Sequence, residues 1–371
     1  MFETGPVQLG FGVDYSPRSG GDRTNRRDAL RLGIAAFAAP EVLRGSEDEA
    51  RELTRRSEET EIGSSTLDQV RQAIDYYGYH YARYDADEVW ERAGGDRRHV
   101  ARLLEHRMTL KQRRELYIDA AWLSLVLAWA AHDRGEVRPA LAYAADARHH
   151  ADQADHPEAQ AWSWDVEATI YFYDDRPDRS LHAVQRGLAL APVGSPAYVR
   201  LLGQLARAHA RLGQVEPAST ALADLRREAD QQPVHVRGLW TADAARAWSI
   251  AASSNLWTGQ HQQAQACAQE ALAIYEEDPS ISPTRLAIAA LDCGMAWLKL
   301  GDPERAVEHG MIALSTPRLS SAIAARSSSL CLALERSFPD AEAVAQLRHA
   351  LKELSGRMKR QAAIAPPKPE L

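Results

Sequence analysis

The sequence predicts an all-α protein, a right-handed α-solenoid of about six helical hairpins. Three observations predict it: a turn signal that recurs along the chain, small residues at fixed distances from each turn, and apolar residues that repeat every three or four positions. Alternating runs of β-branched residues, which would predict strands, are missing from the sequence.

The turn signal is a Gly or Asp that follows a stretch of helical length and precedes another. It occurs at Gly135, Asp175, Gly213, Gly259 and Gly301, with a degenerate sixth copy at Phe338. Successive turns are 40, 38, 46, 42 and 37 residues apart. Such a period is typical of stacked hairpins, in which each unit buries its apolar face only against its neighbours. We therefore expect the solenoid over residues 115–360.

Small side chains occupy two positions in every repeat. Seven residues before the turn stand Ala128, Ala168, Ala206, Ala252, Gly294 and Cys331, and five residues after it stand Ala140, Ser180, Ala218, Ala264, Ala306 and Ala343. Two antiparallel helices approach closely only where neither carries a bulky side chain. The pattern therefore indicates the seam between the two helices of each hairpin.

Composition limits the class of protein. The 371 residues are 45% hydrophobic, which is enough to bury a core, and the net charge of −7 argues against a protein that coats nucleic acid. Cys267, Cys293 and Cys331 lie far apart with no CxxC, which excludes a disulfide scaffold and a cysteine-based zinc ribbon. We expect a cytoplasmic protein that neither enters a membrane nor binds DNA directly.

The repeats resemble the tetratricopeptide (TPR) family, which has small residues at these two offsets and a Gly or Asp in the turn. The family has a further small residue later in the second helix, and the six copies here have Ala147, Gly187, Leu225, Ala271, Ala313 and Ala350. The spacing exceeds the usual repeat of about 34 residues. Longer helices or loops must therefore take up the surplus.

The N-terminal part carries a second resemblance, to actinobacterial Xre-type transcription regulators, in which TPR-like repeats follow a helix-turn-helix. Residues 8–12 are similar to the end of such a domain and residues 26–32 to its junction. The helix-turn-helix itself is not in this sequence. Either the protein lacks it, or this chain is the regulatory part alone.

Arg26 and Arg27, before the short apolar stretch 32–39, are also compatible with a twin-arginine export signal. The alternative is an amphipathic helix over residues 26–39, which Asp28 and Arg31 favour because they interrupt the apolar stretch. We expect a tail over residues 1–25, a helical cap over 26–114 and a second tail over 361–371.

Catalytic motifs for nucleotide, metalloprotease or serine-hydrolase chemistry are absent from the sequence. A polar cluster around Asp146, His149 and His156 is better interpreted as a solvated helix end than as a metal site, because metal ligands need support from a second element. We expect no catalytic residue, metal or cofactor.

The functional surface should be the concave face, which the first helix of each hairpin lines. The TPR resemblance places its residues thirteen, ten, six, three and two positions before each turn. The candidate groove residues, with two adjacent polar residues included, are Trp122, Trp129, His132, Asp165, Thr169, Phe172, Arg200, Gln204, Arg207, Arg211, Arg246, Ser249, Ser253 and Asp292.

Arginines from the central repeats flanked by aromatic residues suit a peptide with a free C-terminus or acidic residues. The alternative is that the arginines pair with Asp165, Asp224 or Glu228 and only make the groove soluble.

Three functions remain open from the sequence. The first is a regulatory module that binds a peptide or small signal in the groove and modulates transcription, with a homodimer as one possible assembly. The second is a scaffold that binds a protein partner and senses no ligand. The third is a helical enzyme, for which His132, Asp133 and Tyr173 are the nearest candidates.

Overall fold

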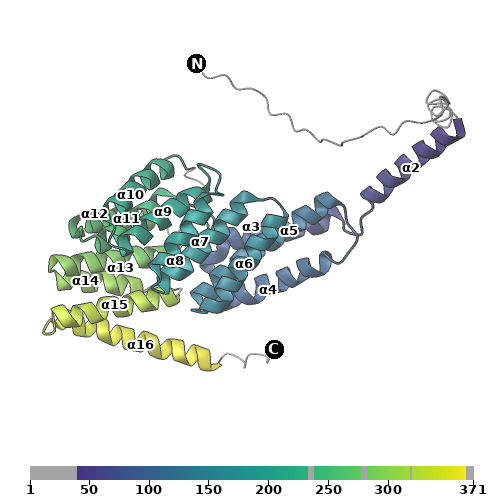
Figure 1. Cartoon of the computed structure of the whole chain (residues 1–371). Helices are drawn as coiled ribbons and strands as arrows, with labels where there is room; N and C mark the ends of the chain where they lie inside the picture. The colour runs from purple at the N-terminus through teal and green to yellow at the C-terminus, as the bar shows by residue number, and fades with distance from the viewer. Residues whose placement is uncertain (1–39, 233–237, 278–281, 318–319, 365–371) are drawn as a thin grey trace, which may run out of the picture. The chain divides into compact units, whose positions relative to one another are not determined.

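The computed structural model describes residues 40–232, 238–277, 282–317 and 320–364 (Figure 1). The predicted N-terminal tail, the stretch 26–39 with its arginine pair, and residues 365–371 lie outside the described residues. The chain divides into two compact units, residues 1–59 and 60–371, and each is taken by itself. The predicted domain limits, at 25, 114 and 360, stay predictions.

The described part of the first unit is one helix, α2 (Pro40–Glu58). The second unit begins with α3 (Ser64–His80), a 3-10 turn η1 (Tyr81–Arg83) and α4 (Ala86–Leu103). All regular structure in the described ranges is helical, which confirms the predicted fold class. None of their helices is long and apolar enough to cross a lipid bilayer.

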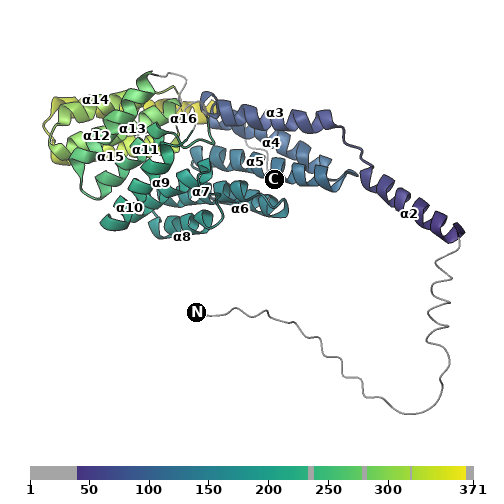
Figure 2. The same cartoon turned by 90° about the horizontal axis from the view of Figure 1, so that it is seen from above.

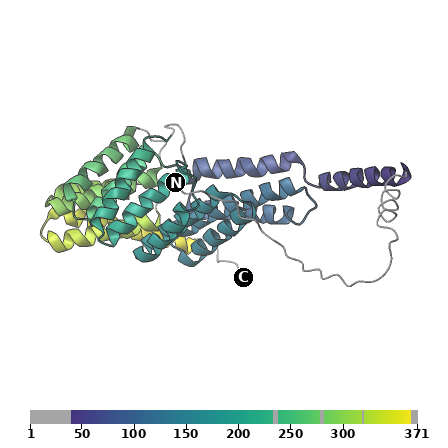
Figure 3. The same ribbon diagram turned by 45° about the horizontal axis from the view of Figure 1, so that its top comes forward.

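Six helical hairpins follow, as predicted, and neighbours in sequence are neighbours in space (Figure 1, Figure 2). The hairpins are α5 (Leu110–Asp133) with α6 (Val137–Gln153), α7 (Pro157–Tyr173) with α8 (Pro177–Leu188), α9 (Pro196–Arg211) with α10 (Val215–Ala229), α11 (Ala244–Trp257) with α12 (His261–Glu277), α13 (Pro283–Leu300) with α14 (Pro303–Leu314), and α15 (Ser321–Ser337) with α16 (Glu342–Ile364). Figure 3 shows the same stack with its teal, green and yellow helices in chain order.

The recurrent turn signal has a backbone cause. All five Gly or Asp turn residues adopt a left-handed conformation, with φ between 56° and 88°. In each turn the next N–H donates to the carbonyl five residues earlier, as Glu136 does to Ala131 at 2.8 Å and Asp302 to Trp297 at 3.0 Å. This Schellman arrangement satisfies carbonyls at the helix end and reverses the chain.

The small residues lie at the helix–helix seam, as predicted. Five of the six pairs are buried on both sides, and the Ser180 hydroxyl donates to the Ala168 carbonyl across the seam at 2.9 Å. At Gly294 a Cβ would lie 2.9 Å from the Ala306 carbonyl oxygen, so α13 and α14 touch through backbone. The last hairpin differs by one residue, because Val344 is fully buried there while Ala343 is half-buried.

The surplus of the longest repeat, 46 residues from turn to turn, lies between α10 and α11. Its last part, residues 238–243, reaches α3, and we name it the crossing segment. The Leu239 N–H donates to the Gly78 carbonyl at 2.7 Å. Gly238 has φ +123°, and a Cβ on it would lie 2.4 Å from that carbonyl oxygen, so the approach requires glycine.

The crossing segment covers part of the concave face. Its Trp240 ring lies 4.9 Å from the ring of Trp122 and 5.3 Å from that of Trp162. Trp162 is fully buried as a result. The candidate groove residue Trp122 and its neighbour Trp162 are therefore part of an internal contact rather than of an open wall.

The last hairpin returns to the first. The Ser321 hydroxyl at the start of α15 donates to the His132 carbonyl near the end of α5 at 3.0 Å. A Cβ on Gly135 would also lie 3.4 Å from the Cβ of Ser321. The concave side is thus bounded by repeats one and six as well as by the central repeats.

Asp119 on α5 is a carboxyl group that the fold buries at a cost. Its side chain is 4% exposed, and Oδ2 has no hydrogen-bond partner among the described residues. Burial raises the pKa of Asp119 to about 7, and Arg71 opposes the rise only in part.

We expect Asp119 to make stability fall as pH rises. The folded state keeps this carboxyl protonated up to about pH 7, whereas the unfolded chain releases the proton near its ordinary pKa of 3.8. The free energy of unfolding should therefore decrease as the pH rises from about 4 to about 7. Asp119→Asn should remove this dependence and stabilise the protein at pH 8 by up to about 4 kcal/mol in urea unfolding. Glu105→Gln, at an exposed site, is the control, and equal pH profiles for both variants would contradict the expectation.

Candidate ligand pocket

The inner faces of the hairpins line a cavity of about 650 Å³. The first helix of each of the six hairpins contributes to its lining, and η1 and the crossing segment close it from the side of α3. This size is typical of sites for small ligands.

The predicted groove residues divide into two groups. Eight line the cavity: Trp129, His132, Thr169, Arg200, Arg207, Arg246, Ser249 and Ser253. Six do not: Trp122, Asp165, Phe172, Gln204, Arg211 and Asp292.

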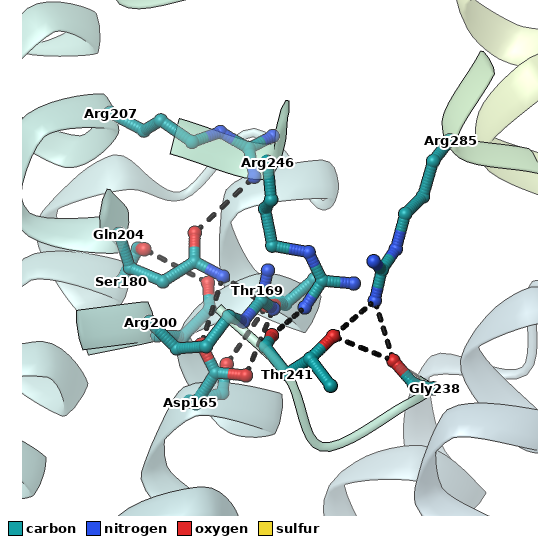
Figure 4. A network of polar contacts seen from close by, with 11 residues as sticks. Asp165, Thr169, Ser180, Arg200, Gln204, Arg207, Gly238, Thr241, Arg246 and Arg285 are labelled. Carbon is teal, nitrogen blue, oxygen red and sulfur yellow. Dashed lines mark hydrogen bonds and ion pairs between the residues drawn. The ribbon is translucent and has the colours of Figure 1, made fainter. Parts of the chain in front are cut away.

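Two of those six, Asp165 and Gln204, lie behind the arginines and hold them (Figure 4). Arg200 donates to Asp165 at 3.0 Å, and the Gln204 amide donates to the same carboxylate at 3.2 Å and also to the Thr169 hydroxyl. The Gln204 carbonyl accepts from Arg207 at 3.3 Å. This network fixes the direction of both arginines from α9.

The other four residues are also placed by contacts. Asp292 is fully buried and pairs with Arg326, a lining residue of α15. Phe172 supports Arg207, whose guanidinium carbon lies 3.9 Å from the ring centroid. Trp122 packs on Trp240 of the crossing segment. Arg211 pairs with Asp175 and lies over Trp257, at 5.3 Å from the ring centroid.

Arg246 and Arg285 contact Thr241, and together with Arg200, whose charge acts on Arg246, we name them the first cluster. Arg246 donates to the Thr241 carbonyl at 2.8 Å, and Arg285 donates to the Thr241 hydroxyl at 3.2 Å and to the Gly238 carbonyl at 2.7 Å. Arg285 also pairs with Asp243 at 3.0 Å. Burial, and then the charges of Arg200 and Arg285, hold the pKa of Arg246 well below its ordinary value.

The second cluster is Arg207 and Arg326, with Tyr173 between them. Arg207 is 7% exposed, and burial lowers the pKa of its guanidinium. Burial alone would raise the pKa of the Tyr173 phenol, but the two arginines bring it below its ordinary value. The ring of His132 lies 5.3 Å from that of Tyr173, and burial lowers the pKa of His132, which keeps the imidazole neutral.

The two clusters therefore hold five arginines and the three aspartates that contact them, namely Asp165, Asp243 and Asp292, and a fourth aspartate, Asp133, also lines the cavity. Three arginines have one aspartate each, whereas Arg207 and Arg246 form no ion pair with a carboxylate among the described residues. Arginine stays protonated in proteins, so the interior carries an excess of positive charge.

Among the described residues, the remaining carboxylates of the lining form no ion pair with these two arginines. Asp230 and Glu277 are exposed, and Asp133 accepts from the Tyr81 hydroxyl at 2.8 Å. Arg83, the sixth arginine of the lining, is exposed as well.

Sequence reasoning missed Arg285, Arg326 and the crossing segment. Arg285 lies sixteen residues before its turn, three beyond the furthest offset used, so one more helical turn would have found it. Arg326 stands twelve residues before Phe338, which matches none of the groove offsets, because the register of the sixth repeat is shifted by one residue. No local signal predicts that residues 238–243 cross to α3.

The described residues contain no group of three or more His, Cys, Asp or Glu side chains that could hold a metal ion. In the polar cluster considered from the sequence, Asp146 pairs with Arg97 at 2.5 Å and accepts from the Ser124 hydroxyl at 2.6 Å. These contacts give the carboxylate a structural role between α4, α5 and α6.

No protein-family model matches the chain, and no curated protein matches it either. Among solved structures, it is similar to the crystal structure of BtubC (BKLC) from P. vanneervenii, with 15% identity and a TM-score of 0.46. That match covers 68% of this chain and 93% of BtubC.

Proposed function

We propose that this chain is a TPR-type regulatory interaction module, related to the sensor region of Xre-type regulators, whose pocket binds an anionic signal and which modulates transcription through protein contacts. The ligand is a small molecule or a peptide that presents carboxylate or phosphate groups. The observation that carries the proposal is the pair of arginines, Arg207 and Arg246, that line the cavity without an ion pair to a described carboxylate.

The cost of these arginines supports a ligand. Burying a guanidinium without an anion loses solvation that neutral hydrogen bonds only partly replace. Arg207, which is buried, has the Gln204 carbonyl, the Tyr173 hydroxyl and the Phe172 face, and Arg246, which is half-buried, has the Thr241 carbonyl. An anion in the cavity would complete both environments with charge-assisted hydrogen bonds.

The position of the pocket supports a regulatory role. A ligand there would touch first helices from repeats one to six, which are otherwise joined mainly through their neighbours. Binding energy gained across repeats favours one spacing of the hairpins over others, so a ligand can shift the population of solenoid shapes. A partner that binds the solenoid would then respond to the ligand.

A specific observation also favours the enzyme alternative. His132, Asp133 and Tyr173, the three candidates that the sequence indicated, all line the cavity, and the His132 and Tyr173 rings are neighbours. A cavity with converging titratable groups is the default place for catalysis. Turnover of a compound found in the pocket would support this alternative over the binding module.

Native mass spectrometry of the purified protein tests the proposal. We expect a stoichiometric anionic compound on the wild-type chain, and Arg207→Gln and Arg246→Gln should each weaken its binding roughly 10- to 100-fold. Arg211→Gln is the matched control, because Arg211 is on α9 like Arg207 but lies outside the pocket lining. A protein companion that survives both pocket variants, with no small ligand, would instead support the scaffold.

A further inference from the structure

The two arginine clusters lie apart in the pocket. In Figure 4, the guanidinium ends of Arg246 and Arg285 point toward Thr241, whereas the Arg207 guanidinium donates to the Gln204 carbonyl. The strongest charges on Arg246 include those of Arg200, Arg285 and Asp243, and the strongest on Arg207 include those of Arg326 and Asp292, with the Tyr173 phenol. Different groups therefore dominate the surroundings of Arg246 and of Arg207.

Gln204 keeps this separation fixed. Its carbonyl binds Arg207 of the second cluster, and its amide binds Asp165, which holds Arg200 of the first. The Thr169 hydroxyl accepts a second bond from the same amide. Because both amide hydrogens and the carbonyl oxygen of the buried Gln204 side chain form hydrogen bonds, this side chain is held in one orientation between the two clusters.

Each cluster has one more positive charge than it has carboxylates. In the first, Asp165 and Asp243 face three arginines, and in the second, Asp292 faces two. A single anion at either cluster would leave the other unbalanced. A ligand with two anionic groups would balance both.

The space around the clusters limits the size of the ligand. Trp240 of the crossing segment covers Trp122 and Trp162, so the part of the concave face at these two residues is filled by an internal contact. The contact of Ser321 with His132 joins repeats six and one beside the cavity. What remains is about 650 Å³, which suits a compact molecule rather than an extended peptide.

We propose that the ligand is a compact organic molecule with two anionic groups, one held by Arg246 and the first cluster and the other by Arg207 and the second cluster. This inference rests on the proposed function and narrows its ligand class. The same chemistry describes a molecule with two phosphates, two carboxylates or one of each.

Alkane-α,ω-bisphosphonates of increasing chain length are suitable probes, with the alkylmonophosphonate of equal length as the control for each. Isothermal titration calorimetry of the full chain with both series measures the gain from the second anion. We expect an optimum length at which the bisphosphonate binds roughly 100-fold more tightly than the monophosphonate, because the second group binds at high effective concentration. Arg207→Gln and Arg246→Gln should each reduce that gain to nearly nothing, and Arg211→Gln should retain it.

The possible outcomes separate this inference from the proposed function. Equal affinity for the two series, with only one of the two pocket variants affecting it, would overturn the two-group ligand and leave a pocket for a single anion. No binding of any phosphonate or of any α,ω-dicarboxylate at millimolar concentration would overturn both. Tighter binding of acidic peptides than of every bisphosphonate would contradict the inference that the ligand is compact. Circular dichroism of each variant would show that it is folded.

Discussion

Replacing Asp165 by alanine is expected to lower the free energy of unfolding by about 3–5 kcal/mol. Asp165 is fully buried on α7 and accepts from Arg200 and Gln204 of α9. The variant leaves the Arg200 guanidinium, which is 6% exposed, without its counter-ion beside Arg246. The penalty is therefore that of an uncompensated buried charge, which exceeds the lost hydrogen bonds.

Urea unfolding measures this effect, and two further variants identify its cause. Asp224→Ala removes a more exposed carboxylate that pairs with Arg227 and should cost about 0–1 kcal/mol. The double change Asp165→Leu with Arg200→Met removes both charges at similar volume and should restore most of the lost stability. A loss below about 1 kcal/mol in Asp165→Ala would show that solvent screens Arg200, and it would weaken the argument for a ligand.

The all-helical solenoid could be predicted from the sequence because its determinants are local. A Gly or Asp at each turn has a left-handed φ, and a small residue on each side lets the two helices touch. Both features act within about twenty residues of chain, so they appear in the sequence as a recurring pattern. The sixth repeat has Phe338 in place of the Gly or Asp at its turn, and it is the repeat whose buried position is shifted by one residue relative to the other five.

The arginines of the central repeats were also within reach of sequence reasoning. Arg200 and Arg246 stand thirteen residues before their turns, and Arg207 stands six before its turn, all on the inner face of first helices. A net charge of −7 gave no hint of a positive interior, because acidic residues elsewhere mask it. Position within the repeat was more informative than composition.

The limits of the pocket could not be predicted, because they depend on contacts between distant parts of the chain. Arg326 reaches the cavity because α15 returns to α5, a contact between residues 189 positions apart. The sequence shows that the repeat between Gly213 and Gly259 is longer than the others. The position of its additional residues, however, depends on the close contact of Gly238 with Gly78. Offsets within a repeat carry no information on either event.

Trp240→Ala is the second change with a large expected effect, about 3 kcal/mol of stability. Trp240 fills the space between Trp122 and Trp162 and lies over Gly78, where a Cβ would be 2.8 Å from its Nε1. Its loss should expose Trp162 and free the end of α3. Hydrogen exchange of α3 and α7 and quenching of tryptophan fluorescence measure both consequences.

Trp297→Ala is the matched control, since Trp297 is also a half-buried tryptophan but lies against Arg305, outside the pocket lining. It should lose stability without a change in the exchange of α3. Trp240→Ala should in addition weaken anion binding, because the Gly238 carbonyl that accepts from Arg285 belongs to the same segment. If exchange in α3 is unchanged, the bond from Leu239 to Gly78 holds the crossing segment without the ring. If acidic peptides bind the variant but not the wild type, the ring is what restricts the pocket to compact ligands.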